Sequence, residues 1–224
     1  MLCCGLCLQA AAQNNLNINY YPGDKTFFHS DYISDITNQY VNYIAAPKDN
    51  IINADRCIGR FDADRKDNYI YFKKISSSDC HIDISTDKVY PYYLIRARAK
   101  TDNIGANIRL CYIRDYDSSG GWLAEDILKI TPDGRLINNK NQTLMQMENG
   151  VFIDFAVEVD IGNHMATVYI DDKPVSQTEI NREIKKLPLV RFWIDTGNNG
   201  DLTLDKTEIT GMSKPYTPDA FNGT

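Results

Sequence analysis

The sequence predicts an all-β protein, a two-layer antiparallel β-sandwich. Short stretches in which apolar and polar residues alternate recur along the chain and are separated by turn residues. The composition favours strands and turns over helices, with 14 Tyr and many Asn, Asp, Ile and Val residues. A chain of 224 residues is also long enough to bury a full core, and β-sandwiches of this size commonly form one domain.

The clearest pattern is a hairpin within residues 152–175. Phe155, Val157 and Val159 share one side of an extended strand, and the other side carries Asp154, Glu158 and Asp160 with Ala156. Gly162-Asn163 interrupts this period of two, which resumes at Met165 and ends at a second turn, Asp171-Asp172-Lys173-Pro174. The hairpin is therefore expected to face water on one side and a core on the other.

Further strands are expected on both sides of this hairpin. Their ranges in chain order are 57–62, 69–75, 81–85, 92–101, 107–114, 127–130, 135–138, 189–194 and 202–209. Residues 33–44 have an approximately helical spacing of apolar residues but are poor helix formers, so a short helix and an irregular loop both stay open. About ten short strands at regular spacing indicate a sandwich.

Two of these strands carry arginines. In 92–101, Arg96 and Arg98 alternate with apolar residues, so their face should meet solvent or a cleft. In 107–114, Ile108, Leu110 and Tyr112 are expected to share one side of the strand. We expect these two strands to be neighbours in one sheet, joined through residues 102–106.

The ends of the chain differ from the predicted domain, which spans residues 13–212. Residues 1–12 are apolar and small and end in Ala10-Ala11-Ala12, which resembles the end of a secretory signal peptide; a disordered or buried segment is the alternative. Residues 213–224 contain two prolines and no periodicity, as in a flexible tail or a linker to a further module. No stretch of about twenty apolar residues predicts a membrane span.

Charge and cysteine content narrow the classes of partner and compartment. The formal net charge is −6 with no compensating basic stripe, which argues against a nucleic-acid partner. Beyond the first twelve residues the cysteines are Cys57, Cys80 and Cys111, an odd number that cannot form a closed disulfide framework. One disulfide, for example between Cys57 and Cys80, and three buried thiols are both compatible with the sequence.

The C-terminal half resembles a known fold. The run DFAVEVDIGNHMATVYIDDKPV, followed by VRFWID and GDLTLDKTEITG, is similar to concanavalin A-like, laminin G-like jelly-roll domains over residues 90–212. The resemblance implies a jelly-roll sandwich. Asp172 stands where the hairpin turn of these domains usually has Gly, and Asp tolerates the left-handed backbone conformation better than most residues.

Two enzyme functions follow from resemblances within this fold. Glu158-Val-Asp160-Ile-Gly-Asn163 is similar to the motif of retaining β-glucanases of the laminarinase and lichenase type, but Asn163 stands where the acid belongs, and an amide cannot protonate the leaving oxygen. An exposed acidic strand face is therefore the favoured interpretation. For a polysaccharide lyase, Arg96, Arg98, Arg109 and Tyr112 with His81 or His164 as base have suitable chemistry, although the characteristic motifs of lyases are absent.

A binding function is favoured over both. The loop Asp115–Trp122 carries Tyr116, Asp117 and Trp122 beside flexible glycines. Sugars stack their apolar faces on aromatic rings while carboxylates take their hydroxyls. We therefore predict carbohydrate binding by Tyr116, Asp117 and Trp122 with Arg96, Arg98 and Arg109, although Trp122 could equally pack in the core. Trp193 is expected to be buried.

These observations favour a secreted or cell-surface, non-catalytic carbohydrate-binding or accessory module whose partner is a glycan. A polysaccharide lyase or glycoside hydrolase is the alternative, and a structural domain of a larger protein is a further one. The resemblance also implies a structural Ca²⁺ bound by Asp205 of the last strand, and oxygen ligands are available in the loop 198–201. No residue spacing indicates zinc, and no glycine-rich phosphate loop is present.

Overall fold

The structure is a computed structural model that describes residues 25–30, 51–52, 57–62, 67–73, 80–86, 88–195 and 200–218. Every regular element in these ranges is a β-strand, and they contain no helix that is long and apolar enough to cross a membrane. The strands are β1 (Lys25–Ser30), β2 (Ile51–Ile52), β3 (Cys57–Asp62), β4 (Asp67–Lys73), β5 (Cys80–Ser85), β6 (Tyr92–Lys100), β7 (Ile108–Tyr116), β8 (Trp122–Ile130), β9 (Arg135–Asn138), β10 (Thr143–Gln146), β11 (Ile153–Asp160), β12 (Met165–Ile170), β13 (Lys173–Glu179), β14 (Leu189–Ile194) and β15 (Asp201–Met212).

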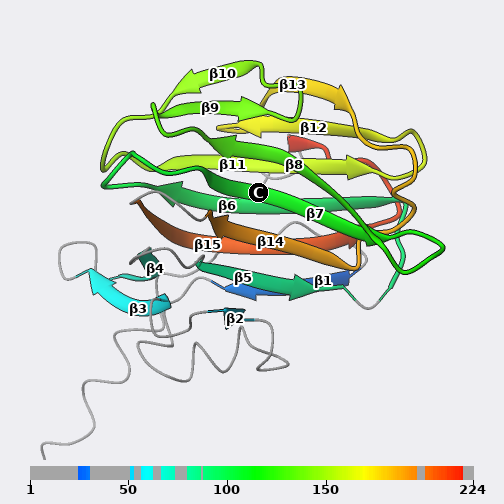
Figure 1. Cartoon of the computed structure of the whole chain (residues 1–224), viewed down its shortest axis with the longest axis horizontal. Helices are drawn as coiled ribbons and strands as arrows, with labels where there is room; N and C mark the ends of the chain where they lie inside the picture. Colours follow the sequence, from blue (N-terminus) through cyan, green and yellow to red (C-terminus); the bar gives the residue numbers. More distant parts are fainter. Residues whose placement is uncertain are drawn as a thin grey trace, which may run out of the picture.

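The strands form two antiparallel sheets (Figure 1). The eight-stranded sheet has the order β13-β12-β11-β6-β15-β4-β3, with β1 paired to β15. The seven-stranded sheet has the order β10-β9-β8-β7-β14-β5-β2. The two-layer antiparallel sandwich predicted from the sequence is confirmed.

One apolar core lies between the two sheets, because each central strand turns its apolar residues to the other layer. The eight-stranded sheet supplies Ile95 and Ala97 of β6, Phe155, Val157 and Val159 of β11, and Leu204 and Ile209 of β15. The seven-stranded sheet supplies Ile108, Leu110 and Ile113 of β7, Ile127 of β8, and Val190, Phe192 and Ile194 of β14. The core-facing side of the hairpin within 152–175 is therefore as predicted, but its other side is not the exposed acidic face that was expected, because Ala156 and Glu158 are only 3% and 8% exposed.

The hairpin continues into a third strand that the sequence did not predict. Asp171-Asp172 joins β12 to β13, and both residues adopt a left-handed backbone conformation, with φ of 49° and 60°. Asp172 thus adopts the conformation expected where related turns have Gly. The resulting edge strand, β13, has mostly exposed side chains, which leaves little apolar alternation to detect in the sequence.

The prediction that the two arginine-bearing strands are neighbours is wrong. β6 belongs to the eight-stranded sheet and β7 to the seven-stranded sheet. Residues 101–107 carry the chain from one layer to the other instead of forming a hairpin. Both strands bury their apolar residues in the same core, so Arg96 and Arg98 of β6 and Arg109 of β7 point to opposite outer faces of the sandwich. Alternation reveals that a strand has one buried face, but it does not reveal which sheet the strand joins.

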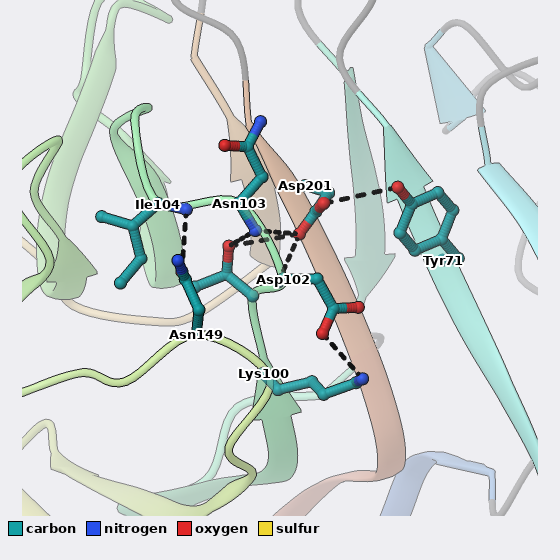
Figure 2. Close-up of polar contacts among 8 residues, drawn as sticks. Tyr71, Lys100, Asp102, Asn103, Ile104, Asn149 and Asp201 are labelled. Atoms are coloured by element: carbon teal, nitrogen blue, oxygen red, sulfur yellow. Dashed lines mark hydrogen bonds and ion pairs between the residues drawn. The ribbon is translucent and has the colours of Figure 1, made fainter.

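A buried carboxylate at the start of β15 holds this crossing in place (Figure 2). Asp201 Oδ1 accepts hydrogen bonds from the backbone N–H groups of Asp102 at 2.8 Å and Asn103 at 3.3 Å, and from Thr101 Oγ1 at 3.2 Å. Its Oδ2 accepts one from the Tyr71 hydroxyl of β4 at 3.4 Å. Asp201 therefore supplies an acceptor to three donors of this turn, of which the Asn103 N–H also donates to Thr101 Oγ1 at 3.2 Å.

The first part of the predicted tail packs on the outer face of the eight-stranded sheet. Tyr216 forms a small apolar cluster with Leu94, Ala156, Tyr169 and Met212. Its ring meets that of Tyr169 edge-on at 5.0 Å, and its hydroxyl donates a hydrogen bond to Asp172 Oδ1 at 3.0 Å. Residues 219–224 lie outside the described residues.

The same segment covers an acidic side chain. The backbone N–H of Tyr216 donates a hydrogen bond to Glu158 Oε2, and only 8% of Glu158 remains exposed. Burial raises the pKa of the Glu158 carboxyl above its usual value; the hydrogen bond from Tyr216 acts in the opposite direction, and the nearby Asp160 charge adds to the rise. Ionisation of Glu158 therefore lowers the stability of the folded protein.

Other sequence expectations fall outside the described residues. They are the segment 1–12, residues 33–44, and the side chains of Cys57 and Cys80. Cys111 is a buried thiol without a disulfide, and its burial raises its pKa.

We expect Asp201→Ala to lower the free energy of unfolding by about 2 kcal/mol or more, because the donors of residues 101–103 lose their acceptor in a buried site. Asp102→Ala is the matched control, since its exposed carboxylate pairs with Lys100, and such surface pairs contribute about 0–1 kcal/mol. Urea denaturation measures both variants. Equal losses would contradict the role assigned to Asp201.

We expect Glu158→Gln to change how stability depends on pH. A carboxyl whose pKa is raised in the folded state keeps its proton longer there than in the unfolded chain, so stability falls as pH rises from about 4.3, the ordinary pKa of Glu, through the raised pKa. The amide keeps an acceptor for Tyr216 but carries no charge. Denaturation across pH 3–8 should therefore show the wild type losing stability relative to Glu158→Gln, and a constant difference would contradict the assignment.

Candidate functional site

Arginine and aromatic side chains cover the outer face of the seven-stranded sheet. We call this surface the arginine–aromatic face. It comprises Arg109, Tyr112 and Arg114 of β7, Trp122 of β8, and Arg191 and Trp193 of β14, all linked by contacts between guanidinium groups and rings.

An irregularity in β7 brings three of these residues to one side. The pairing of β7 with β8 shifts between Arg109 and Cys111 and again between Cys111 and Tyr112. Leu110 and Cys111 are therefore both fully buried, and Tyr112 emerges beside Arg109. The prediction that Tyr112 shares a face with Ile108 and Leu110 is wrong, because strict alternation does not hold across a bulge.

An exposed aromatic pair stands at one end of this face. Trp122 opens β8 and is 61% exposed, and Tyr116 closes β7 and is 44% exposed. Their rings meet edge-on, with centroids 6.3 Å apart. Arg114 Cζ lies 3.2 Å from the centre of the Trp122 ring. Of the two open alternatives, core or surface, Trp122 is at the surface.

The loop between these two aromatic residues is held by Asp117. Its Oδ1 accepts hydrogen bonds from Ser119 Oγ at 2.6 Å and from the backbone N–H groups of Ser119 at 2.8 Å and Gly121 at 2.7 Å. The bond from the Ser119 hydroxyl, with those from the backbone, lowers the pKa of the Asp117 carboxyl. Asp117 thus shapes the turn between Tyr116 and Trp122, and its Oδ1 is already occupied.

The middle of the face is a stack around Trp193. The guanidinium carbon of Arg109 lies 3.9 Å from the centre of the Trp193 ring, and that of Arg191 lies 5.3 Å away. Tyr112 and His81 each meet the same ring edge-on, at 5.7 Å and 6.2 Å. Trp193 is half-buried on the outer face and does not enter the core, whereas its neighbours Phe192 and Ile194 do.

The positive charges of this face are compensated unequally. Arg109 forms ion pairs with Asp126 at 2.6 Å and Asp195 at 2.9 Å. Arg114 is only 4% exposed, and within the described residues no carboxylate pairs with it. Its cross-strand neighbours are Ala124 on β8 and Leu189 on β14, neither of which carries a charge.

The predicted binding residues therefore separate into two groups. Tyr116, Trp122 and Arg109 lie on the arginine–aromatic face, with Asp117 in the adjoining loop. Arg96 and Arg98 lie on the outer face of the other sheet. There Arg96 pairs with Glu208 at 3.7 Å, and Arg98 lies 3.9 Å from both Asp154 and Asp205. These two arginines cannot contribute to a site built on Trp122.

Sequence reasoning missed Arg114, Arg191 and Trp193 as members of the same surface. One signal was available: Arg191 and Trp193 are two residues apart in a strand and therefore share a side. The bulge in β7 has no comparable signal, since Leu110 and Cys111 look like an ordinary part of an alternating strand.

Two of the candidate calcium ligands, Asp201 and Asp205, contact other groups of the protein. Asp205 is fully buried and lies beside Arg98, and Asp201 Oδ1 accepts hydrogen bonds from the 101–103 turn. Residues 198–199 lie outside the described residues. In the part of the chain that is described, no group of three or more His, Cys, Asp or Glu side chains is placed to hold a metal ion. A calcium site at Asp205 stays a prediction.

The glucanase-like motif spans the end of β11 and the turn that follows it. Asp160 Oδ1 accepts a hydrogen bond from the backbone N–H of Asn163 at 2.9 Å, and its Oδ2 accepts one from Asn163 Nδ2 at 2.7 Å. Glu158 lies under Tyr216. His164, the second histidine considered as a base, lies in the same β11–β12 turn of the other sheet, so it is not part of the arginine–aromatic face.

Comparisons with known proteins concern the fold. No protein-family model matches the sequence, and no curated protein matches it. The chain is similar to a solved sialidase structure at 11% identity and a TM-score of 0.62, covering 84% of this chain and 19% of the sialidase. It also resembles a Trypanosoma rangeli sialidase in complex with sialic acid (9% identity, TM-score 0.51), covering 69% of this chain and 27% of that one.

An alginate lyase is a third structural neighbour, at 10% identity and a TM-score of 0.50, covering 69% of this chain and 78% of the lyase. The chain thus spans only 19% of the first sialidase but most of the lyase. Because sequence identity is so low, these likenesses bear on architecture. With its two antiparallel sheets, the chain has the concanavalin A-like, laminin G-like jelly-roll fold that its sequence resembles.

Proposed function

We propose that this protein is a secreted or cell-surface, non-catalytic carbohydrate-binding or accessory module that binds a glycan on its arginine–aromatic face. The observation that carries the proposal is the exposed pair Tyr116 and Trp122, fixed at the end of that face. Large aromatic rings are usually buried, and a neighbouring pair left in solvent is typical of a binding surface.

The geometry suits a sugar ligand. The apolar face of a pyranose ring stacks on an indole, and hydroxyl groups around it need polar partners nearby. Trp122 offers the ring, and the loop closed by Asp117 fixes its distance from Tyr116. Because Arg114 supports Trp122 from below and Tyr116 contacts its edge, little side-chain freedom remains to be lost on binding.

The structural neighbours support the same class of function. Two are sialidases, one of them in complex with sialic acid, and one is an alginate lyase, so each is named for action on a glycan. The chain covers 19% and 27% of the two sialidases, which fits a module that accompanies a catalytic domain. Further modules of a larger protein therefore belong to the proposal.

A polysaccharide lyase is the second candidate, and one observation favours it. His81 and Tyr112 both contact Trp193, which is stacked with Arg109 and Arg191. A lyase needs a cation to neutralise the uronate carboxylate and a base to remove the adjacent proton. The motifs characteristic of lyases are absent from the sequence, which leaves binding as the better-supported function.

We expect Trp122→Ala to weaken glycan binding by about tenfold or more, equivalent to about 1.4 kcal/mol, because the stacking surface is removed. Since Trp122 is 61% exposed, the melting temperature should change little. Phe152→Ala is the matched control: this aromatic residue stacks with Arg98 beside the other sheet and should leave binding unchanged. Calorimetric titration with polysaccharides that the wild type retains measures the affinities.

Incubating the protein with the same polysaccharides, and analysing the chain ends afterwards, separates the two candidate functions. Retention of a polysaccharide without new unsaturated or reducing ends supports a binding module. New unsaturated ends that disappear in Tyr112→Phe would instead assign lyase activity. Unchanged affinity in Trp122→Ala would remove the exposed pair from the proposal.

A further inference from the structure

We infer that the glycan bound here is acidic, and that Arg114 is the residue that selects it by pairing with a carboxylate or sulfate group. This inference rests on the proposed glycan-binding function. It starts from the charge of Arg114, which is 4% exposed and whose Nε has no hydrogen-bond partner in the described part of the chain.

Nearby carboxylates are engaged elsewhere. Asp115, the next residue, accepts hydrogen bonds from the backbone N–H groups of Lys185 at 2.9 Å and Lys186 at 3.1 Å through Oδ2, and from that of Tyr116 at 2.7 Å through Oδ1. Asp126 of β8 pairs with Arg109. Asp117 is occupied by its own loop. Among the described residues, the guanidinium group of Arg114 therefore contacts the aromatic rings of Trp122 and Tyr112 and no carboxylate.

Such an arrangement favours an anion from outside. A buried cation without a counter-charge is costly, and an arriving anion recovers part of that cost. The planar guanidinium matches carboxylate and sulfate oxygens in a two-point hydrogen bond, and it can do so while it stacks on a ring.

The position of Trp122 connects this anion site with the sugar site. Arg114 covers one face of the Trp122 ring, with its Cζ 3.2 Å from the ring centre. A sugar stacked on the other face of the ring is therefore close to the guanidinium. A charged substituent that passes the ring edge would meet Arg114, whereas a neutral sugar would gain only the stacking contact. Arg114 therefore acts as a specificity-determining residue in this site.

The test uses acidic glycans, each paired with its neutral parent: polygalacturonate and alginate with their carboxyl-reduced forms, sialyllactose with lactose, and dextran sulfate with dextran. Affinities are measured by calorimetry for the full chain and three variants. Arg114→Gln removes the charge, Arg114→Lys keeps the charge without the planar fork, and Arg135→Gln is the matched control. Arg135 opens β9, beside the end of β8 that is opposite to Trp122, and forms an exposed pair with Asp133.

We expect the wild type to bind at least one acidic glycan about tenfold or more tightly than its neutral parent. Arg114→Gln should bind both members of that pair equally, Arg114→Lys should keep part of the preference, and Arg135→Gln should keep all of it. Whether the preferred pair carries carboxylate or sulfate identifies the anion. Thermal melting checks that each variant is folded, and the ratio of acidic to neutral affinity is compared within each variant, so that a general weakening of the stacking contact on Trp122 cancels.

Two outcomes overturn the inference. Equal binding of acidic and neutral partners by the wild type would leave glycan binding in place and remove the acidic preference. A preference that persists in Arg114→Gln would assign it to another residue. Binding to neither member of any pair would instead remove the proposed function itself.

Discussion

The consecutive burial of Leu110 and Cys111 decides what the outer face of the seven-stranded sheet presents. A regular strand would send Tyr112 and Arg114 into the core that receives Ile108, and a buried arginine there would lie among mostly apolar side chains. The shift in pairing with β8 lets both Leu110 and Cys111 fill the core, and it turns Tyr112 and Arg114 outward beside Arg109. The arginine–aromatic face depends on this one irregularity.

That face differs in kind from its counterpart across the sandwich. On the eight-stranded sheet, Arg96 and Arg98 are matched by Glu208, Asp154 and Asp205, and Tyr216 covers part of the surface. On the seven-stranded sheet, the arginines are layered with aromatic rings, and the layering ends in the exposed Trp122. Arg96 and Arg98 lie near carboxylates on one surface, whereas Arg114 on the other pairs with none among the described residues and lies beneath an exposed ring.

The fold was predictable because alternation is a local property of each strand, and Phe155, Val157 and Val159 display it without interruption. Tyr116 and Trp122 were candidates because they flank a loop rich in glycine and acidic residues, but the sequence left open whether Trp122 is exposed or packs in the core. The sheet to which each strand belongs was not predictable, because β6 and β7 lie in different sheets but bury the same kind of residue in the core between them. Burial of Glu158 by Tyr216 was also beyond reach, because it joins segments 58 residues apart through a backbone donor.

The most direct measurement is the mapping of ligand-induced shifts in the nuclear magnetic resonance spectrum of the labelled protein, titrated with an oligosaccharide that it retains. Binding at the arginine–aromatic face predicts the largest shifts at the Trp122 indole N–H, the Arg114 guanidinium and the backbone of Tyr116–Gly121, with none at Arg96, Arg98 or Phe152. Shifts concentrated on the eight-stranded sheet, with the Trp122 indole unmoved, would contradict the account.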